Sequence, residues 1–190
     1  MDGGNRYDST EFGTIYGATD LEGCFAETLA RYRPSPAVLA ALGRDAEWRR
    51  RGFMDPGSVP ADWRHRRVIV HLELGREVRF LDVEATATHT VLTEELAEEL
   101  ADVGHGPLDV AGVRGPDRRI TRAIAQWAYT ALDQSGDPAF AGIRYLSRLD
   151  PYECWAIFDR TPVLEIGRHT ITTGTRALRS VQDVFGIRVF

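Results

Sequence analysis

Four side chains of the kinds that bind and cleave a charged small molecule mark this sequence. Arg6, Tyr16 and Glu27 fall within the first 27 residues, and Ser147 follows much later. A guanidinium can bind phosphate oxygens bidentately, an aromatic ring can stack on a flat ligand, and a carboxylate can stabilise positive charge. A serine hydroxyl can add a hydrogen bond. These residue types can surround one small molecule, so we interpret them as candidate site residues.

The elements that would position Tyr16 and Glu27 are a short strand and a helix. Residues 14–16 are typical of a strand that ends at Gly17, and Asp20 is a plausible N-cap for a following helix. Apolar residues then recur with helical spacing and predict one buried stripe: Leu21, Phe25, Leu29 and Tyr32. Pro34 and Pro36 should end this helix. Glu27 lies off the stripe, on a face shared with Gly23 and Arg31.

Each candidate also has an ordinary structural interpretation. Glu27 could pair with Arg31 at i+4 on a solvated helix face. Arg6 could be a surface arginine, and Tyr16 could lie at the edge of a core. Ser147 could cap a turn before Pro151. No residue decides the matter singly, whereas the ordered set favours a site.

The remaining sequence predicts an α+β fold in one domain over residues 1–190, because strands and helices alternate without a regular βαβ rhythm. Residues 37–66 are interpreted as irregular with one short helix, and Arg49–Arg51 and Arg64–Arg67 form basic clusters that are usually solvated. Strands are expected at 68–74, 78–83, 142–147, 154–158, 163–173 and 187–190, the first two as a possible hairpin. Helices are expected from Thr93, from Asp117 to about Leu132, and over residues 175–184.

Composition excludes several classes of protein. The net charge of −5 does not favour nucleic acid or an anionic membrane, and all 23 basic residues are arginine, which excludes a Schiff-base or P-loop lysine. Cys24 and Cys154 lack metal-type spacing and are expected as reduced thiols. No signal peptide or run of about 18 apolar residues is visible. A cytoplasmic location is therefore expected.

The common catalytic and metal-binding motifs are missing. No dinucleotide fingerprint, P-loop, H-E-x-x-H or G-x-S-x-G motif occurs. The five histidines are scattered, and His71 with Glu73 is a weak zinc signal. We expect no metal site.

Two segments together resemble a known family. Arg-Tyr-Asp, then Phe-Gly-Thr-Ile-Tyr-Gly-Ala and Glu-Gly-Cys-Phe-Ala-Glu-Thr-Leu, are similar to the start of the RES-domain toxins, which are named for an Arg, a Glu and a Ser. The later segment Gly-Ile-Arg-Tyr-Leu-Ser, residues 142–147, is similar to the region that carries the family's Ser. The resemblance covers most of the chain.

The resemblance implies a fold, an activity and partners. It implies an ADP-ribosyltransferase-like core of mixed or antiparallel sheet with flanking helices. It also implies a toxin that consumes NAD⁺ by hydrolysis or phosphorolysis and is neutralised by an Xre-type helix-turn-helix antitoxin, and it leaves a homodimer open. The family usually has a further strand and loop before its Arg, whereas only five residues precede Arg6. We therefore expect this chain to lack that first strand.

Residue roles carry over by position. Arg6, Tyr16, Glu27 and Ser147 match the family's Arg, strand Tyr, Glu and Ser, and are the expected catalytic residues. Additional contacts to NAD⁺ are expected from three residues: Tyr7, Arg31 and Arg144. A protein ADP-ribosyltransferase and an inactive partner-binding module are the alternative functions, and direct DNA binding is disfavoured.

Overall fold

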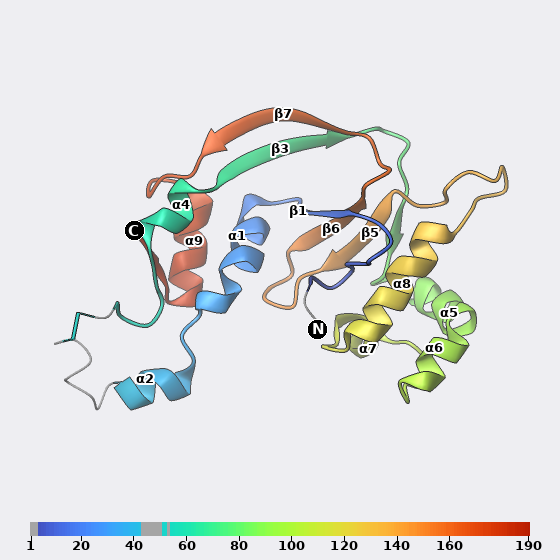
Figure 1. Cartoon of the computed structure of the whole chain (residues 1–190), viewed down its shortest axis with the longest axis horizontal. Coiled ribbons are helices and arrows are strands. Elements are labelled where there is room, and N and C mark those ends of the chain that lie inside the picture. Colours follow the sequence, from blue (N-terminus) through green and yellow to red (C-terminus); the bar gives the residue numbers. More distant parts are fainter. Residues whose placement is uncertain (1–3, 43–50, 53) are drawn as a thin grey trace. The chain divides into compact units, whose positions relative to one another are not determined.

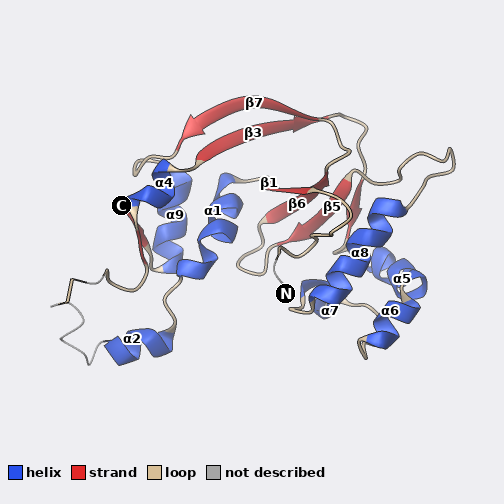
Figure 2. Ribbon diagram, in the orientation of Figure 1, coloured by secondary structure: helices blue, strands red, loops and turns tan. Residues whose placement is uncertain are grey.

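The computed structural model describes residues 4–42, 51–52 and 54–190, so most of the predicted Arg49–Arg51 cluster lies outside the described residues. It confirms an α+β fold, with helices and strands interspersed along the chain (Figure 2). Two compact units emerge, one from residues 1–19 and 74–163 and the other from residues 20–73 and 164–190. We call them unit 1 and unit 2 and describe each by itself. The prediction of one domain stays a prediction.

Unit 1 is built on a four-stranded mixed sheet in the order β1-β6-β5-β4 (Figure 1). Its strands are β1 (Thr14–Ala18), β4 (Phe80–Asp82), β5 (Gly142–Leu146) and β6 (Glu153–Phe158). β4 pairs with β5 in parallel, while β6 is antiparallel to both of its neighbours. The register aligns Leu81, Ile143, Ala156 and Tyr16 across the four strands. Since side chains alternate along a strand, these four side chains share one face of the sheet.

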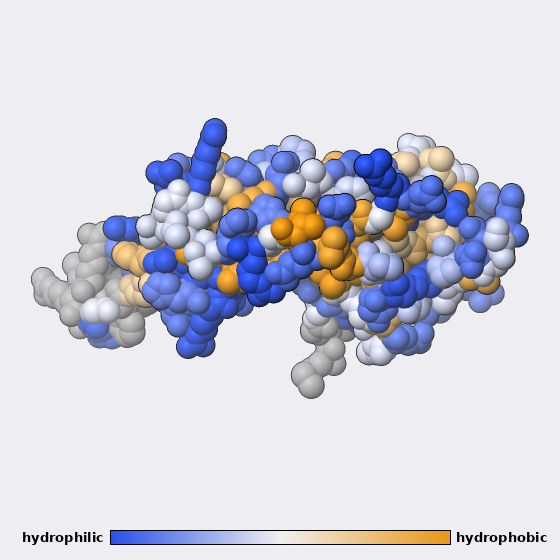
Figure 3. Space-filling model, turned by 90° about the horizontal axis from the view of Figure 1, so that it is seen from above, coloured by the Kyte–Doolittle hydropathy of each residue, from blue (hydrophilic) through white to orange (hydrophobic). Residues whose placement is uncertain are grey.

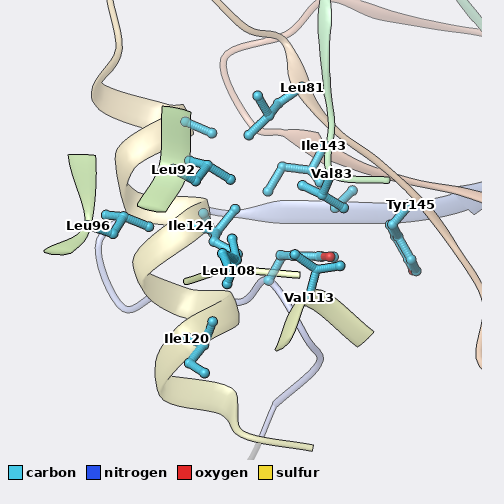
Figure 4. Close-up of a cluster of buried hydrophobic side chains, with 14 of the residues drawn as sticks. Leu81, Val83, Leu92, Leu96, Leu108, Val113, Ile120, Ile124, Ile143 and Tyr145 are labelled. Carbon is cyan, nitrogen blue, oxygen red and sulfur yellow. The ribbon is translucent and has the colours of Figure 1, made fainter. Parts of the chain in front are cut away.

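Helices of unit 1 enclose its apolar core. They are α5 (Thr86–Glu95), α6 (Ala97–Asp102), α7 (Val110–Arg114) and α8 (Arg118–Thr130). Ile120 and Ile124 of α8 belong to the same buried cluster as Ile143 of β5 and Val83, which follows β4 (Figure 4). The Asp117 carboxylate accepts a hydrogen bond from the Arg119 N–H, which confirms that Asp117 starts α8. The first turn of this helix is therefore firmly placed beside the core.

Unit 2 contains the predicted helix of Glu27. Its elements are α1 (Leu21–Leu29), the 3₁₀ turn η1 (Ala30–Tyr32), α2 (Pro36–Leu42), β2 (Ser58–Val59), α4 (Ala61–His65), β3 (Val68–Leu74), β7 (Val163–Thr170), α9 (Arg176–Phe185) and β8 (Arg188–Val189). β2 pairs with β8 in parallel, and β3 pairs with β7. Phe25 and Leu29 of α1 and Leu178 and Val181 of α9 are buried, and the two helices pack together. The predicted apolar stripe of α1 thus forms part of a core.

Strand pairing overturns the possible hairpin of residues 68–83. β3 pairs with β7, and β4 instead pairs with β5. Pairing beside β5 lets Leu81 and the adjoining Val83 enter the core of unit 1, which a hairpin with β3 would not do. Burial of apolar side chains therefore decided the partner.

Helix boundaries differ from the prediction in two places. The helix expected from Thr93 begins at Thr86 and is interrupted at Leu96. The earlier start was missed because β-branched threonines have a low helix propensity, although this helix buries His89 and Leu92. The helix expected to reach Leu132 ends at Thr130, where Ala131 becomes extended, and Leu132 is 64% exposed rather than buried. A short helix, α7, was not predicted.

The pair of strands β3 and β7 carries an exposed apolar face. Apolar residues at alternate positions of both strands are exposed, namely Val68, Val70, Leu72, Leu164 and Ile166. Figure 3 looks down on these strands and shows hydrophobic atoms in orange near the middle of the view. None of the helices in the described part of the chain is long and apolar enough to cross a membrane.

Candidate functional site

Arg6 is the most deeply buried arginine among the described residues of the candidate site. Only 7% of the residue is exposed, and its Nη1 atom is buried without a hydrogen-bond partner among the described residues. The Thr121 hydroxyl of α8 donates to the Arg6 carbonyl at 2.6 Å. The guanidinium carbon lies 5.2 Å from the centre of the Tyr145 ring, within cation–π range. Arg6 is therefore held inside unit 1 and is not a surface arginine.

Tyr16 fixes the loop that carries Arg6. Its hydroxyl accepts a hydrogen bond from the Tyr7 N–H at 2.9 Å and donates one to the Asp8 carboxylate at 2.8 Å. Burial, together with the hydrogen bond to Asp8, raises the pKa of Tyr16 well above its ordinary value. The hydroxyl is thus engaged in positioning the loop, while the predicted stacking of the ring on a ligand stays a prediction.

Tyr7 lies fully buried between the Arg6 loop and the sheet. Its ring centre is 5.1 Å from that of Tyr145, with the two planes tilted by 59°. Its hydroxyl is buried without a partner among the described residues. Burial raises the pKa of Tyr7 to about 12, and the neighbouring Arg6 charge opposes this rise. Tyr7 therefore stays protonated at neutral pH and presents a hydroxyl beside Arg6.

Ser147 lies just beyond the end of β5 and is buried. Its hydroxyl oxygen accepts a hydrogen bond from the Leu149 N–H at 3.0 Å, and its own N–H donates to the Tyr152 carbonyl at 2.9 Å. The hydroxyl thus caps a turn, as the ordinary interpretation expected, and keeps its own proton for donation. By alternation along the strand, Ser147 shares a sheet face with Tyr145 and Ile143.

Glu84 is a buried carboxylate that the sequence did not single out. Its side chain is 10% exposed and makes a bidentate ion pair with Arg114, with a shortest distance of 2.6 Å. Its Oε1 atom also accepts a hydrogen bond from the Leu146 N–H at 2.9 Å. Glu84 therefore ties α7 to the end of β5, next to Ser147. Nothing in the local sequence distinguishes it from an exposed acid after a strand.

Glu27 lies in unit 2, on an exposed part of α1. Its side chain makes no hydrogen bond or ion pair with any described residue of the chain. Arg31 does not pair with it; the Arg31 guanidinium donates to the Tyr32 hydroxyl at 2.9 Å and lies over the Tyr32 ring. The ordinary interpretation of Glu27 as half of an i+4 ion pair is thus wrong, and its carboxylate is available to a ligand.

Arg144 projects from the other face of the sheet of unit 1. It pairs with Asp82 at 3.0 Å and with Glu153 at 2.8 Å. Hydrogen bonds from the Thr19 hydroxyl and, next, from Arg144 lower the pKa of Glu153 below its ordinary value. Arg144 alternates with Tyr145, so its side chain and that of Tyr145 point to opposite faces. This guanidinium is already neutralised by two carboxylates.

Unit 1 thus brings together Arg6, Tyr7 and Tyr16, with Tyr145 linking them to the strand that leads to Ser147. Glu27 and Arg31 belong to unit 2, where Arg31 contacts Tyr32 and the Glu27 side chain has no partner among the described residues. Among the described residues, no group of three or more His, Cys, Asp or Glu side chains is placed to hold a metal ion. Cys24 and Cys154 form no disulfide.

One comparison with known proteins found a family match. A family model described as the RES domain matches residues 1–177. The chain has no match among the curated proteins and none among the solved structures. A likeness to the ADP-ribosyltransferase fold therefore stays a prediction.

Proposed function

Because the chain belongs to the RES-domain family, a domain associated with toxin–antitoxin modules, we propose that it is a toxin that cleaves the nicotinamide–ribose bond of NAD⁺. The acceptor of the ADP-ribose is water or phosphate. An Xre-type helix-turn-helix antitoxin is the partner that neutralises it.

The observation that carries this proposal is the buried Arg6 guanidinium. A buried N–H donor without an acceptor is costly, and most such donors in native proteins are paired. Arg6 keeps an unpaired Nη1 although Tyr16, Asp8 and Thr121 hold its loop in place by hydrogen bonds. A fixed cation of this kind suits the pyrophosphate of a dinucleotide.

The remaining site residues suit cleavage of the glycosidic bond. Departure of nicotinamide takes the bonding electron pair and leaves positive charge on the ribose, as in glycoside hydrolysis. Glu27, which has no partner among the described residues, is the carboxylate proposed to stabilise that charge and to accept a hydrogen bond from a ribose hydroxyl. Tyr7, Tyr16, Arg31 and Ser147 are proposed to contact the dinucleotide.

Release of nicotinamide from NAD⁺ by the purified chain tests this function. We expect Glu27→Gln and Arg6→Gln each to lower turnover by at least about tenfold, equivalent to about 1.4 kcal/mol of barrier stabilisation. Glu22→Gln, which removes another carboxylate of α1, is the matched control and should leave turnover unchanged. Release that depends on added phosphate would identify phosphorolysis, and label from NAD⁺ on protein would identify an ADP-ribosyltransferase.

Two results would contradict the proposal. The first is an absence of nicotinamide release by folded protein with or without phosphate. The second is unchanged turnover in both variants, with circular dichroism like that of the unsubstituted chain, which would remove the assignment of Glu27 and Arg6.

A further inference from the structure

Three buried polar atoms without hydrogen-bond partners gather around the Arg6 loop. They are Arg6 Nη1, the Tyr7 hydroxyl and Arg118 Nη1, out of five such atoms in the described part of the chain. Arg118 is the first residue of α8 and lies far from Arg6 in the sequence. No sequence motif marks it, and nothing in the proposed function yet uses it.

Thr121 joins Arg118 to the Arg6 loop. Its hydroxyl oxygen lies 2.6 Å from the Arg6 carbonyl oxygen, and Arg118 lies one turn earlier on the same helix. The first turn of α8 therefore begins beside the Arg6 loop. The charges of Arg6 and Arg118 also both act on the Tyr7 hydroxyl, where each lowers its pKa against the larger effect of burial. Two cations therefore lie around one buried hydroxyl.

No carboxylate of the described residues neutralises this pair of arginines. Neither Arg6 nor Arg118 makes an ion pair among the described residues. Glu84 also acts on Tyr7, but both of its oxygens are bound to Arg114 and one also to the Leu146 N–H. Neighbouring like charges with unpaired donors are unfavourable in the ligand-free chain. They become favourable when an anion with several acceptor oxygens binds.

We propose that Arg118 is a second arginine for phosphate binding, and that Arg6 and Arg118 together select a ligand with two linked phosphates over one with a single phosphate. This inference rests on the proposed function, because it assigns the pyrophosphate of the dinucleotide to this part of unit 1. Two guanidinium groups supply enough donors for the oxygens of both phosphates. The Tyr7 hydroxyl, protonated at neutral pH, supplies a further donor to the same anion.

Calorimetric titration with ADP-ribose, ADP and AMP tests the role of Arg118. In the unsubstituted chain we expect ADP to bind at least tenfold more tightly than AMP. Arg118→Gln should weaken the binding of ADP and ADP-ribose at least tenfold and that of AMP less than threefold. The variant should therefore lose most of the preference for two phosphates. The neighbouring Arg119→Gln is the matched control: its side chain is 67% exposed and pairs with Asp117, and it should bind all three ligands normally.

Thermal unfolding separates a binding role from a structural one. Arg118→Gln removes a half-buried cation whose buried Nη1 has no partner among the described residues, so the unfolding temperature of the ligand-free chain should not fall, while the rise caused by ADP-ribose should shrink. A lower unfolding temperature with equal weakening of all three ligands would assign Arg118 a structural role and overturn the proposal.

The remaining outcomes distinguish this inference from the proposed activity. ADP-ribose binding that depends on Arg118, in a chain that releases no nicotinamide, would support the inference and refute the activity. Nicotinamide release, together with ADP-ribose binding that Arg118→Gln does not change, would support the activity and refute the inference. A chain that binds no ADP-ribose would overturn the inference.

Discussion

At the scale of single residues, the hydroxyls of Tyr16 and Thr121 hold the Arg6 loop by hydrogen bonds. The hydroxyls of Tyr16 and Tyr7 lie in the same part of unit 1 but have opposite environments. That of Tyr16 is fully engaged, with the Tyr7 N–H and Asp8 as partners, whereas that of Tyr7 has none among the described residues. The two tyrosines therefore separate positioning of the loop from contact with a ligand.

Tyr16→Phe should lower the free energy of unfolding by about 1–3 kcal/mol, because it leaves a backbone N–H and a carboxylate without their partner. Tyr7→Phe removes a buried hydroxyl that lies beside Arg6 and has no hydrogen-bond acceptor among the described residues, so it should lower the free energy of unfolding by no more than about 0.5 kcal/mol. Urea unfolding followed by circular dichroism measures both. An equal loss in the two variants would contradict the assignment of the loop-fixing role to Tyr16.

At the scale of elements, α8 both completes the core of unit 1 and holds the site. Ile124 on its inner side is fully buried against the sheet (Figure 4). Its first turns supply Thr121, which donates a hydrogen bond to the Arg6 carbonyl, and Arg118, whose charge acts on the Tyr7 hydroxyl. The position of the site therefore depends on how this helix packs.

Ile124→Ala should lower the free energy of unfolding by about 2–5 kcal/mol, because it leaves a cavity between α8 and the sheet. Leu132→Ala, just beyond the helix, is the control: this side chain is exposed and its removal should change stability by no more than about 0.5 kcal/mol. Urea unfolding again gives the comparison. Similar losses would contradict the exposed position of Leu132.

At the scale of the whole molecule, the chain builds two separate apolar cores. The large cluster of buried residues around Ile124 belongs entirely to unit 1, while α1 and α9 bury Phe25, Leu178 and Val181 in unit 2. Each unit draws on two distant parts of the chain. The cores share no residue, so perturbations of one should be independent of the other.

Leu178→Ala should cost about 2–5 kcal/mol, as for Ile124→Ala, and the double variant should lose the sum of the two within about 0.5 kcal/mol. Additivity is expected because Ile124 belongs to the buried cluster of unit 1 and Leu178 belongs to unit 2. Urea unfolding of the single and double variants forms the cycle. A deviation well beyond that margin would show that the two cores are coupled.

The sequence by itself determined the fold class, most strands and helices, and the family. Periodicity predicts the buried stripe of α1, and the order of Arg6, Tyr16, Glu27 and Ser147 carries the resemblance to RES domains. These features are local or lie in linear order, so they are visible without a fold. The threonines of α5 concealed a helix, because threonine has a low helix propensity whereas burial of Leu92 in the core stabilises the helix.

Only the tertiary structure decided the partners of strands and of polar groups. It placed β4 beside β5, left Glu27 without the alternative pairing to Arg31, and brought Thr121 of α8 to Arg6 across more than half of the chain. It also buried Glu84, which looks ordinary in the sequence. The physical reason is that burial and hydrogen-bond satisfaction depend on contacts between distant segments, which no local pattern specifies.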